Sequence, residues 1–481
     1  MLKNRYYTRT HPFTILTHLK SSVILLLIPV IQQLMFKPEG IFEVISTMGF
    51  NAIYAAAVIA YAIYSYRFLM YRLRPRGIQI KNGFFRKKYY TIPYSKIQTI
   101  NIHKNIIARA FGAIRVSFDT PAGLSRVYDI SGYISAKKSA YIASKVENEK
   151  PKIAVYKSGN LNMLLMSAFW SNPASGLLII APFVSKLGDI LGIEIQQLVD
   201  QSFVFDFRWQ LVAMGIPPVA AGIANILLFG WAVSMGVQFM RYGRFSAYRQ
   251  GEYIVISRGI INKNISYTRS DRIAAVTVNQ SLLMSFLRLY SSGIFTIGAG
   301  KLKGDKSLII AAEKKNTLYK SLKNIVRVSA KELKSVSPRK NTLISYLCVP
   351  IWVTLFTISL IVVADYFTVI NDAFQVLLIF ALIPLFWWIL FRIFAHKHSH
   401  LAMNNRCAIV CGYKKWTVQK YLIEFDKIQY ISIKQSIFQK RKNTCDVRVY
   451  LYFEKRASHT VKHLPKDEAE KLVLYIQNRI K

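Results

Sequence analysis

The clearest metal-binding pattern in the sequence is a run of alternating histidines, His396, His398 and His400. On an extended chain these three imidazoles would share one face, as ligands of a zinc ion do. No acidic or thiolate residue is adjacent, so a basic cap beside a membrane segment is the favoured interpretation. The sequence therefore predicts neither a bound metal nor a cofactor.

Cys407 and Cys411 lie four positions apart on an expected strand and so face the same way. We expect them to be small core side chains, and the four cysteines form no disulfide framework. The sequence has no nucleophile elbow, HExxH motif or paired-carboxylate pattern, and residues 298–301 are too short to form a P-loop. The sequence therefore shows none of these catalytic motifs.

Basic residues are the remaining chemical signal. The 481 residues include 65 Lys plus Arg against 24 Asp plus Glu, a net charge of +41, yet 52% are hydrophobic. This combination favours membrane segments joined to basic domains. Near an anionic leaflet each contacting cation contributes about 1 kcal/mol, although a solvated face that enforces topology explains the charges equally well. The candidate lipid- or partner-contacting residues are Arg86, Lys87, Lys88, Lys96, Lys104, Arg109, Arg258, Lys263, Arg272, Lys414, Lys415, Lys427, Lys440 and Arg441.

One thirteen-residue pattern occurs three times, at 95–107, 271–283 and 426–438, with offsets of 176 and 155 positions. Each copy has Ser or Asp, a basic residue, Ile, then Ile or Val at alternating positions, a polar triplet and two apolar residues. The alternation of Ile and Val predicts a β-strand. The first Ile and the next Ile or Val are three positions apart instead of two, and this extra residue predicts a β-bulge. Repeats this far apart are whole modules.

Six apolar stretches separate the modules, and about 20 such residues suffice to cross a bilayer. The expected spans are 13–35, 41–66, 161–185, 209–240, 343–364 and 374–394. The three outer loops would hold only Lys37, Lys186 and Arg208. The positive-inside rule then places both termini and all three modules in the cytoplasm of a multipass protein of the cell membrane.

After each pair of spans the sequence shows strands and then one amphipathic helix. The expected helices are 135–149, 314–328 and 466–480, and Asn82-Gly83 predicts a hairpin turn. The predicted division is transmembrane hairpins at 1–66, 151–240 and 336–395, with β-domains at 67–150, 241–335 and 396–481.

This plan resembles the bacterial PH-domain family of multipass membrane proteins (bPH2, DUF304), of the YdbT-like kind. The resemblance lies in the three motif copies, the Gly83, Gly259 and Gly412 turns, the paired apolar stretches and the opening residues 9–12. It implies a mixed membrane protein with six transmembrane helices in three hairpins, each followed by a PH-like β-sandwich or barrel with a C-terminal helix. The third copy departs at 439–442, where the first has 108–112, so we expect its loop to differ in shape or partner.

The resemblance also implies function: a non-enzymatic membrane scaffold acting at the inner leaflet in envelope protection, of the bacteriocin-tolerance type. Its partners would be anionic membrane lipids and a smaller PH-domain membrane protein. Two other functions remain open from the sequence. The first is a transporter or lipid-moving channel formed by the six spans. The second is a nucleic-acid binder, which membrane tethering and the lack of an aromatic-basic repeat disfavour.

Overall fold

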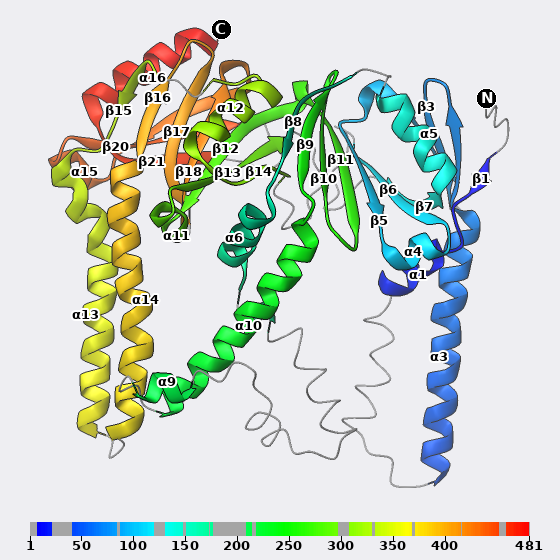
Figure 1. The fold of residues 1–481 in the computed structure, drawn as a ribbon, viewed down its shortest axis with the longest axis horizontal. Coiled ribbons are helices and arrows are strands. Elements are labelled where there is room, and N and C mark those ends of the chain that lie inside the picture. The colour runs from blue at the N-terminus through cyan, green and yellow to red at the C-terminus, as the bar shows by residue number, and fades with distance from the viewer. Residues whose placement is uncertain are drawn as a thin grey trace.

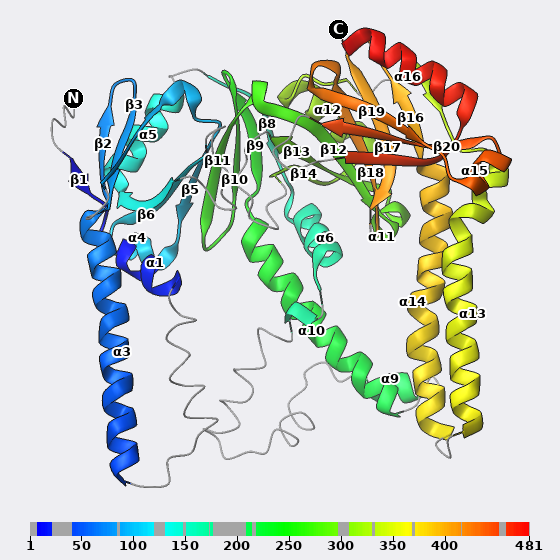
Figure 2. The same ribbon diagram turned by 180° about the vertical axis from the view of Figure 1, so that it is seen from behind.

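The computed structural model describes residues 7–21, 41–83, 87–119, 130–147, 151–172, 174–176, 208–213, 218–296, 307–329, 332–367, 371–414, 416–451 and 458–480. They form a layer of β-sheets from which long helices leave on one side (Figure 1). The view from behind shows the same arrangement (Figure 2). These helices are α3 (Ile41–Phe68), α10 (Pro218–Tyr242), α13 (Leu343–Phe367) and α14 (Asn371–His398).

The first unit pairs a four-stranded sheet with three strands of a second sheet, and a helix closes it. The first sheet contains β1 (Thr8–Arg9), β2 (Met70–Arg74), β3 (Gly77–Asn82) and β4 (Lys88–Pro93). The second contains β5 (Thr99–Lys104), β6 (Ala113–Asp119) and β7 (Ile130–Ser135). The remaining elements are α1 (Thr14–Ser21), η1 (Tyr94–Lys96), α4 (Ile106–Ala110) and the closing helix α5 (Ala136–Glu147).

The second unit repeats this order. Its first four strands are β8 (Lys152–Lys157), β9 (Ser246–Gln250), β10 (Tyr253–Arg258) and β11 (Lys263–Arg269). The next three are β12 (Ile273–Ser281), β13 (Leu289–Thr296) and β14 (Ser307–Lys314). Its other elements are α6 (Asn160–Trp170), α9 (Arg208–Ala213), η2 (Ser270–Arg272), α11 (Leu282–Phe286) and the closing helix α12 (Lys315–Ile325).

The third unit follows the same order again. Its first four strands are β15 (Lys334–Val336), β16 (His400–Met403), β17 (Cys407–Lys414) and β18 (Thr417–Glu424). The last three are β19 (Ile428–Lys434), β20 (Thr444–Leu451) and β21 (Ser458–Pro465). Its other elements are η3 (Lys340–Thr342), η4 (Phe425–Lys427), α15 (Ile437–Arg441) and the closing helix α16 (Lys466–Ile480).

The long helices of each unit are inserted between its first and second strands. β8 pairs with β9, so that Tyr156 faces Ala247 across the ladder although α6 and α10 separate them in the chain. β1 and β15 pair with β2 and β16 in the same way. None of these first strands was predicted from the sequence, and β1 and β15, with two and three residues, are too short to show alternation. The insertion ties both ends of each helical segment to one sheet.

Each copy of the repeated motif forms the expected strand, namely β5, β12 or β19. The bulge is confirmed in two copies by register shifts after Ile273 and Ile428. A five-residue helix then begins in every copy, with Asn105, Ser281 or Ser436 as the N-cap. The expectation that the third copy has a different loop shape is therefore wrong, because its capping residue is retained and satisfies the first turn.

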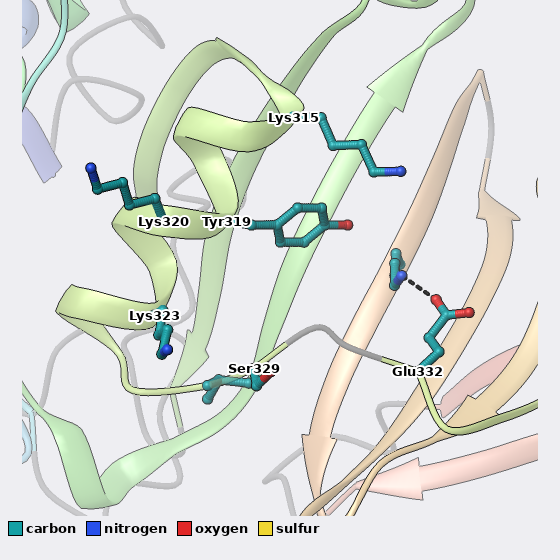
Figure 3. A pocket seen from close by; sticks show the side chains of 8 residues that line it. Lys315, Tyr319, Lys320, Lys323, Ser329 and Glu332 are labelled. Carbon is teal, nitrogen blue, oxygen red and sulfur yellow. Dashed lines mark hydrogen bonds and ion pairs between the residues drawn. The ribbon is translucent and has the colours of Figure 1, made fainter.

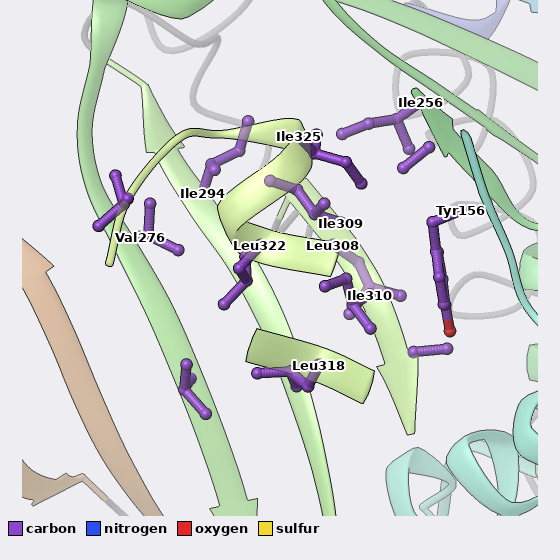
Figure 4. Packing of buried hydrophobic residues seen from close by; sticks show 14 of the residues in the cluster. Tyr156, Ile256, Val276, Ile294, Leu308, Ile309, Ile310, Leu318, Leu322 and Ile325 are labelled. Carbon is purple, nitrogen blue, oxygen red and sulfur yellow. The ribbon is translucent and has the colours of Figure 1, made fainter. Parts of the chain in front are cut away.

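The sheets run from one unit into the next. β5 pairs with β11, and β12 pairs with β18, so that each motif strand joins the fourth strand of the following unit. Ile100 faces Tyr267 at the first junction, and Val276 faces Leu422 at the second. In the second unit, side chains of α12 such as Leu318 pack over this continuous sheet (Figure 4). The three units therefore share backbone ladders and form one row.

The expectation of six transmembrane helices in three hairpins is wrong. Within the described ranges, only the helical stretch Lys340–Leu360 is long and apolar enough to cross a membrane, with a mean hydropathy of 2.0. The expected third span begins as α6, whose Met163 and Met166 are buried in the core of the second unit. An apolar core helix and a membrane helix have similar composition, so hydropathy alone does not separate them. Parts of the spans expected at 13–35, 161–185 and 209–240 lie outside the described residues.

Two of the three expected glycine turns are present. Gly83 and Gly259 have φ values of 93° and 102°, which L-residues with side chains rarely adopt. Gly412 instead lies inside β17, where the two sheets of the third unit approach closely. A Cβ atom at Gly412 would lie 2.4 Å from the carbonyl oxygen of Thr460. This close approach explains the glycine in place of the expected turn.

Replacing this strand glycine tests the sheet contact. We expect Gly412→Ala to lower the free energy of unfolding by about 1–3 kcal/mol, because the backbone of β21 must move to admit the methyl group. The matched control is Gly159→Ala, since nothing lies within 4 Å of a Cβ atom there. Thermal unfolding of the two full-length variants in detergent should separate them. Equal midpoints would contradict the contact.

Candidate functional site

Every unit has two ends, and the long helices leave from one of them, here named the helix-side end. In the second unit α10 leads into β9, and the β10–β11 turn returns to the same place. There the N–H of Gly259 donates to the carbonyl of Gly243 at 2.8 Å, and that of Ile260 to Met240 at 3.0 Å. The strands alternate in direction, so η2 lies at the opposite end, here named the far end.

Side-chain contacts fix the same end in the other units. In the third unit the rings of Phe391 on α14 and Trp416 in the β17–β18 turn lie 5.8 Å apart. The Tyr346 hydroxyl on α13 donates to the Lys462 carbonyl at 2.9 Å. In the first unit the ring of Phe13, which immediately precedes α1, lies 5.8 Å from that of Phe111 at the end of α4. Long helices and motif helices therefore meet at one end.

The short helices α4, α11 and α15 all lie at the helix-side end and expose apolar side chains (Figure 1). In α15, Ile437 and Phe438 are each 79% exposed. The exposed apolar residues in α4 and α11 and at their C-caps are Ile106, Ile107, Phe111, Leu283, Phe286 and Leu287. The apolar residues that close each motif in the sequence supply most of this surface. We call these eight residues the apolar ridge.

The sequence analysis assigned no role to the apolar ridge, although the two apolar residues at the end of each motif copy were visible in the sequence. The two apolar residues that end each copy follow the capping residue directly, so the first turn of the short helix carries them. Five residues form little more than one turn, and one turn cannot bury every apolar side chain against the sandwich. The exposed residues Ile260, Ile261 and Trp416 extend the apolar surface at the same end.

The fourteen basic candidates divide between the two ends. Those at the helix-side end are Lys87, Lys88, Lys104, Arg109, Arg258, Lys263, Lys414, Lys440 and Arg441. Those at the far end are Lys96, Arg272 and Lys427, one in each 3-10 helix before a motif strand. Arg86 and Lys415 lie outside the described residues. Most of the basic candidates therefore lie at the same end as the apolar ridge, and three lie at the far end.

Two of the far-end cations have acidic neighbours. Lys427 lies 2.9 Å from Asp426, and Arg272 lies 3.7 Å from Asp271. Among the helix-side candidates, the Arg258 guanidinium stands 5.2 Å from the ring of Tyr242. Apolar side chains flanked by cations match the chemistry of an anionic interface, where the apolar groups enter the boundary and the cations meet the head groups.

The histidine run does not form a shared face on an extended chain, because α14 continues through His398. Nε2 of His396 lies 3.2 Å from the Thr342 hydroxyl, whereas Nδ1 of His398 lies 2.9 Å from the Phe394 carbonyl. Nε2 of His400 meets a carboxylate oxygen of Glu332 at 3.1 Å. The described residues contain no group of three or more ligands that could hold a metal ion.

Both cysteines of the strand pair are core residues, as expected. Cys407 is 2% exposed and Cys411 is 3% exposed. Burial raises the pKa of each thiol to about 12, with nearby carboxylates adding to the effect. The thiols therefore stay protonated and unreactive near neutral pH.

A cavity of about 650 Å³ lies between α12 and β18. Figure 3 shows Lys315 and Tyr319 directed from α12 toward the strands of the third unit, and Lys320 directed away. The Lys420 ammonium donates to Glu332, which also meets His400. Burial alone would raise the pKa of Glu332, but the hydrogen bond and charge of Lys420 outweigh it and lower that pKa. The carboxylate therefore neutralises Lys420 at the junction between two units.

Removing this carboxylate tests its structural role. We expect Glu332→Gln to lower the free energy of unfolding by about 1–3 kcal/mol, because Lys420 loses a charged hydrogen bond. The lowered pKa of Glu332 means that its contribution is present above the ordinary glutamate range and disappears as the pH falls through the folded-state pKa. The matched control is Glu468→Gln, which removes an exposed 3.9 Å pair with Arg339. An equal loss in both variants would contradict the assignment.

Comparison with known proteins agrees with the repeat. The profile of the family "Bacterial PH domain" (bPH_2) matches residues 23–150, 195–323 and 351–480. The chain is also 25% identical over 267 residues to the UPF0699 transmembrane protein YdbT of Bacillus subtilis (strain 168). That alignment covers 50% of this chain and 52% of the relative, about half the length of each. With three matches that together cover most of its length, this chain belongs to the bacterial PH-domain family.

Proposed function

We propose that this protein is a non-enzymatic membrane scaffold whose row of three PH-like units lies against an anionic lipid surface. The observation that carries the proposal is the apolar ridge. Three short helices at equivalent positions expose large apolar side chains at the end from which the long helices leave. In water, exposure of so much apolar surface on one side is unfavourable, and a lipid interface removes that cost.

The long helix α13 supports membrane anchoring. α13 exposes Trp352 at 68%, Phe356 at 68% and Leu360 at 56%, within the stretch whose length and hydropathy suit a bilayer. The related Bacillus protein is itself described as a transmembrane protein. Helices with exposed apolar faces and a sheet layer at one end suit a protein whose sheets rest on the membrane surface.

Charge supports the cytoplasmic side for the sheet layer. Arg339 and Lys340 lie at the start of the apolar stretch Lys340–Leu360, where that helix leaves the layer. Basic residues next to a membrane helix favour the cytoplasmic face. We further propose, on the family resemblance, that the scaffold acts in envelope protection with a smaller PH-domain membrane protein as a partner.

The position of the ridge relative to lipid is measurable. In a Cys348→Ser background, we expect a bimane label at Phe438→Cys to be quenched strongly by brominated lipids in nanodiscs, because the ridge enters the interface. A label at Asp426→Cys should be quenched little, since this exposed residue lies at the far end of the same unit. Equal quenching at both positions would overturn the proposed orientation.

The two groups of basic residues should differ in their effect on lipid binding. At about 1 kcal/mol per cation lost, the double variant Lys440→Glu/Arg441→Glu should lower affinity for phosphatidylglycerol by at least about 30-fold, because the new carboxylates are also repelled by the lipid. The matched far-end variant Lys96→Glu/Lys427→Glu should change it little, because those cations lie away from the surface. Titration of mixed-lipid nanodiscs at low and high salt measures both. A similar loss in the two variants would leave only a general charge effect.

A further inference from the structure

Each end of the row has a strand with one edge that pairs with no other described strand. β4 lies at the edge of the first sheet, and β19 lies at the edge of the last. Each pairs on one side only among the described strands, with β3 and β20 respectively. Figure 2 shows β3 and β19 near opposite ends of the layer. Because β4 is the fourth strand of its unit and β19 is a motif strand, they are the two types that join at both internal junctions.

From this complementarity we propose that β19 of one molecule pairs with β4 of a second copy, which extends the row head to tail. The joint would repeat the ladders that β5 makes with β11 and β12 makes with β18. Since both internal joints keep the long helices on one side, the new joint would keep those of the next copy there too. The occupant of each free edge is therefore a second copy of this chain.

The burial of the motif strand changes with its position in the row. β12 is buried along almost its whole length, and β5 is buried at its first four residues. In β19, by contrast, Tyr430 is 47% exposed, and Ile431 and Ile433 are only partly buried against the core of the third unit. On the other edge, Tyr89 is 60% exposed and Tyr90 is 47% exposed. Both strands are thus more exposed than their equivalents at the internal junctions.

The internal junctions fix the expected register. Tyr267 faces Ile100, and Leu422 faces Val276, so the two ladders coincide when the repeats are aligned. Moving Tyr267 back by the 176-residue offset gives Thr91, and moving Val276 forward by the 155-residue offset gives Ile431. Thr91 of one copy should therefore face Ile431 of the next.

The same register fixes the neighbouring pairs. Tyr90 should face Ser432, and Tyr89 should face Ile433, where it would cover the partly buried isoleucine. Pro93 has no N–H to donate, but it falls at the end of β4, where the ladder would finish. The pairing is therefore compatible with the sequence of both edges.

Charge complementarity supports the second copy as the occupant. α12 has no acidic residue, whereas α16 carries Asp467, Glu468 and Glu470 near its start. α12 reaches the following unit, because the Lys420 ammonium lies 5.9 Å from the ring of Tyr319. In the aligned repeats Tyr319 corresponds to Glu470, since the residues before them, Leu318 and Ala469, are both fully buried.

On the opposing edge, the residue that corresponds to Lys420 is Tyr89. The Lys81 ammonium stands 5.6 Å from the ring of Tyr89. The proposed joint would therefore bring Lys81 of one copy toward Glu470 of the other, in a chain where acidic residues are scarce. Opposite charges at this place favour the pairing of two copies.

A cross-linking experiment tests the register directly. Two full-length chains in a Cys348→Ser background, one Ser432→Cys and one Tyr90→Cys, are purified separately, reconstituted together and oxidised. The three remaining cysteines are buried. We expect a disulfide-linked heterodimer, because these positions face each other across the ladder. The matched control replaces Tyr90→Cys with Thr91→Cys, whose side chain points to the other face, and should cross-link at least about fivefold less.

A charge variant provides a second test, because its expected result is tighter self-association between the native strands and not a loss of binding, which misfolding could also cause. The register places Lys434 opposite Lys88, and like charges facing each other weaken a ladder. Lys434→Glu should therefore tighten self-association about fivefold in analytical ultracentrifugation, whereas the control Lys471→Glu on α16 should not. Absence of the heterodimer, equal cross-linking in the control pair, or unchanged association in Lys434→Glu would each overturn the proposal.

Discussion

The backbone ladder between each motif strand and the next unit is the interaction on which the architecture depends. Peptide groups at the edge of β5 or β12 need partners when they are buried, and the adjoining strand of the next unit supplies them. Because the register is the same at both junctions, each unit is set against its neighbour in the same way. The row therefore follows from one repeated strand contact.

This repeated contact also aligns the ends of the units. All three have the same strand order, so their turns, motif helices and long helices meet at one side. The apolar ridge and most of the basic candidates consequently form one surface although they are far apart in the sequence. A single unit would offer one short apolar helix, whereas the row offers three on the same side of the layer.

Position in the row also explains differences in sequence between equivalent strands. β17 is buried on both faces, with Val410 in the core of its own unit and Ile409 in that of the second. It reads as a continuous apolar run for this reason. In β3 of the first unit, Gln79 separates Ile78 and Ile80. These differences in apolar pattern reflect what each strand packs against more than its intrinsic preference for the β conformation.

The sequence by itself determined the local elements with strong periodicity. The three motif strands, the bulge at Ile273 and Ile428, and the three closing helices all follow from residue order, because alternation and helical spacing are properties of neighbouring residues. The candidate basic residues were also visible from the sequence. Their division between two ends was not, because it depends on how many times the chain reverses between them.

The tertiary structure alone decided which apolar segments are core and which strands join. Met163 lies in a stretch that reads as a membrane span, yet it packs into the second unit. Ile100 and Tyr267 are far apart in the chain, and nothing local to either residue specifies the other. Burial and edge pairing depend on contacts between distant segments, whereas hydropathy and periodicity report only on near neighbours. That physical difference separates what could be read from the sequence from what had to be observed in the fold.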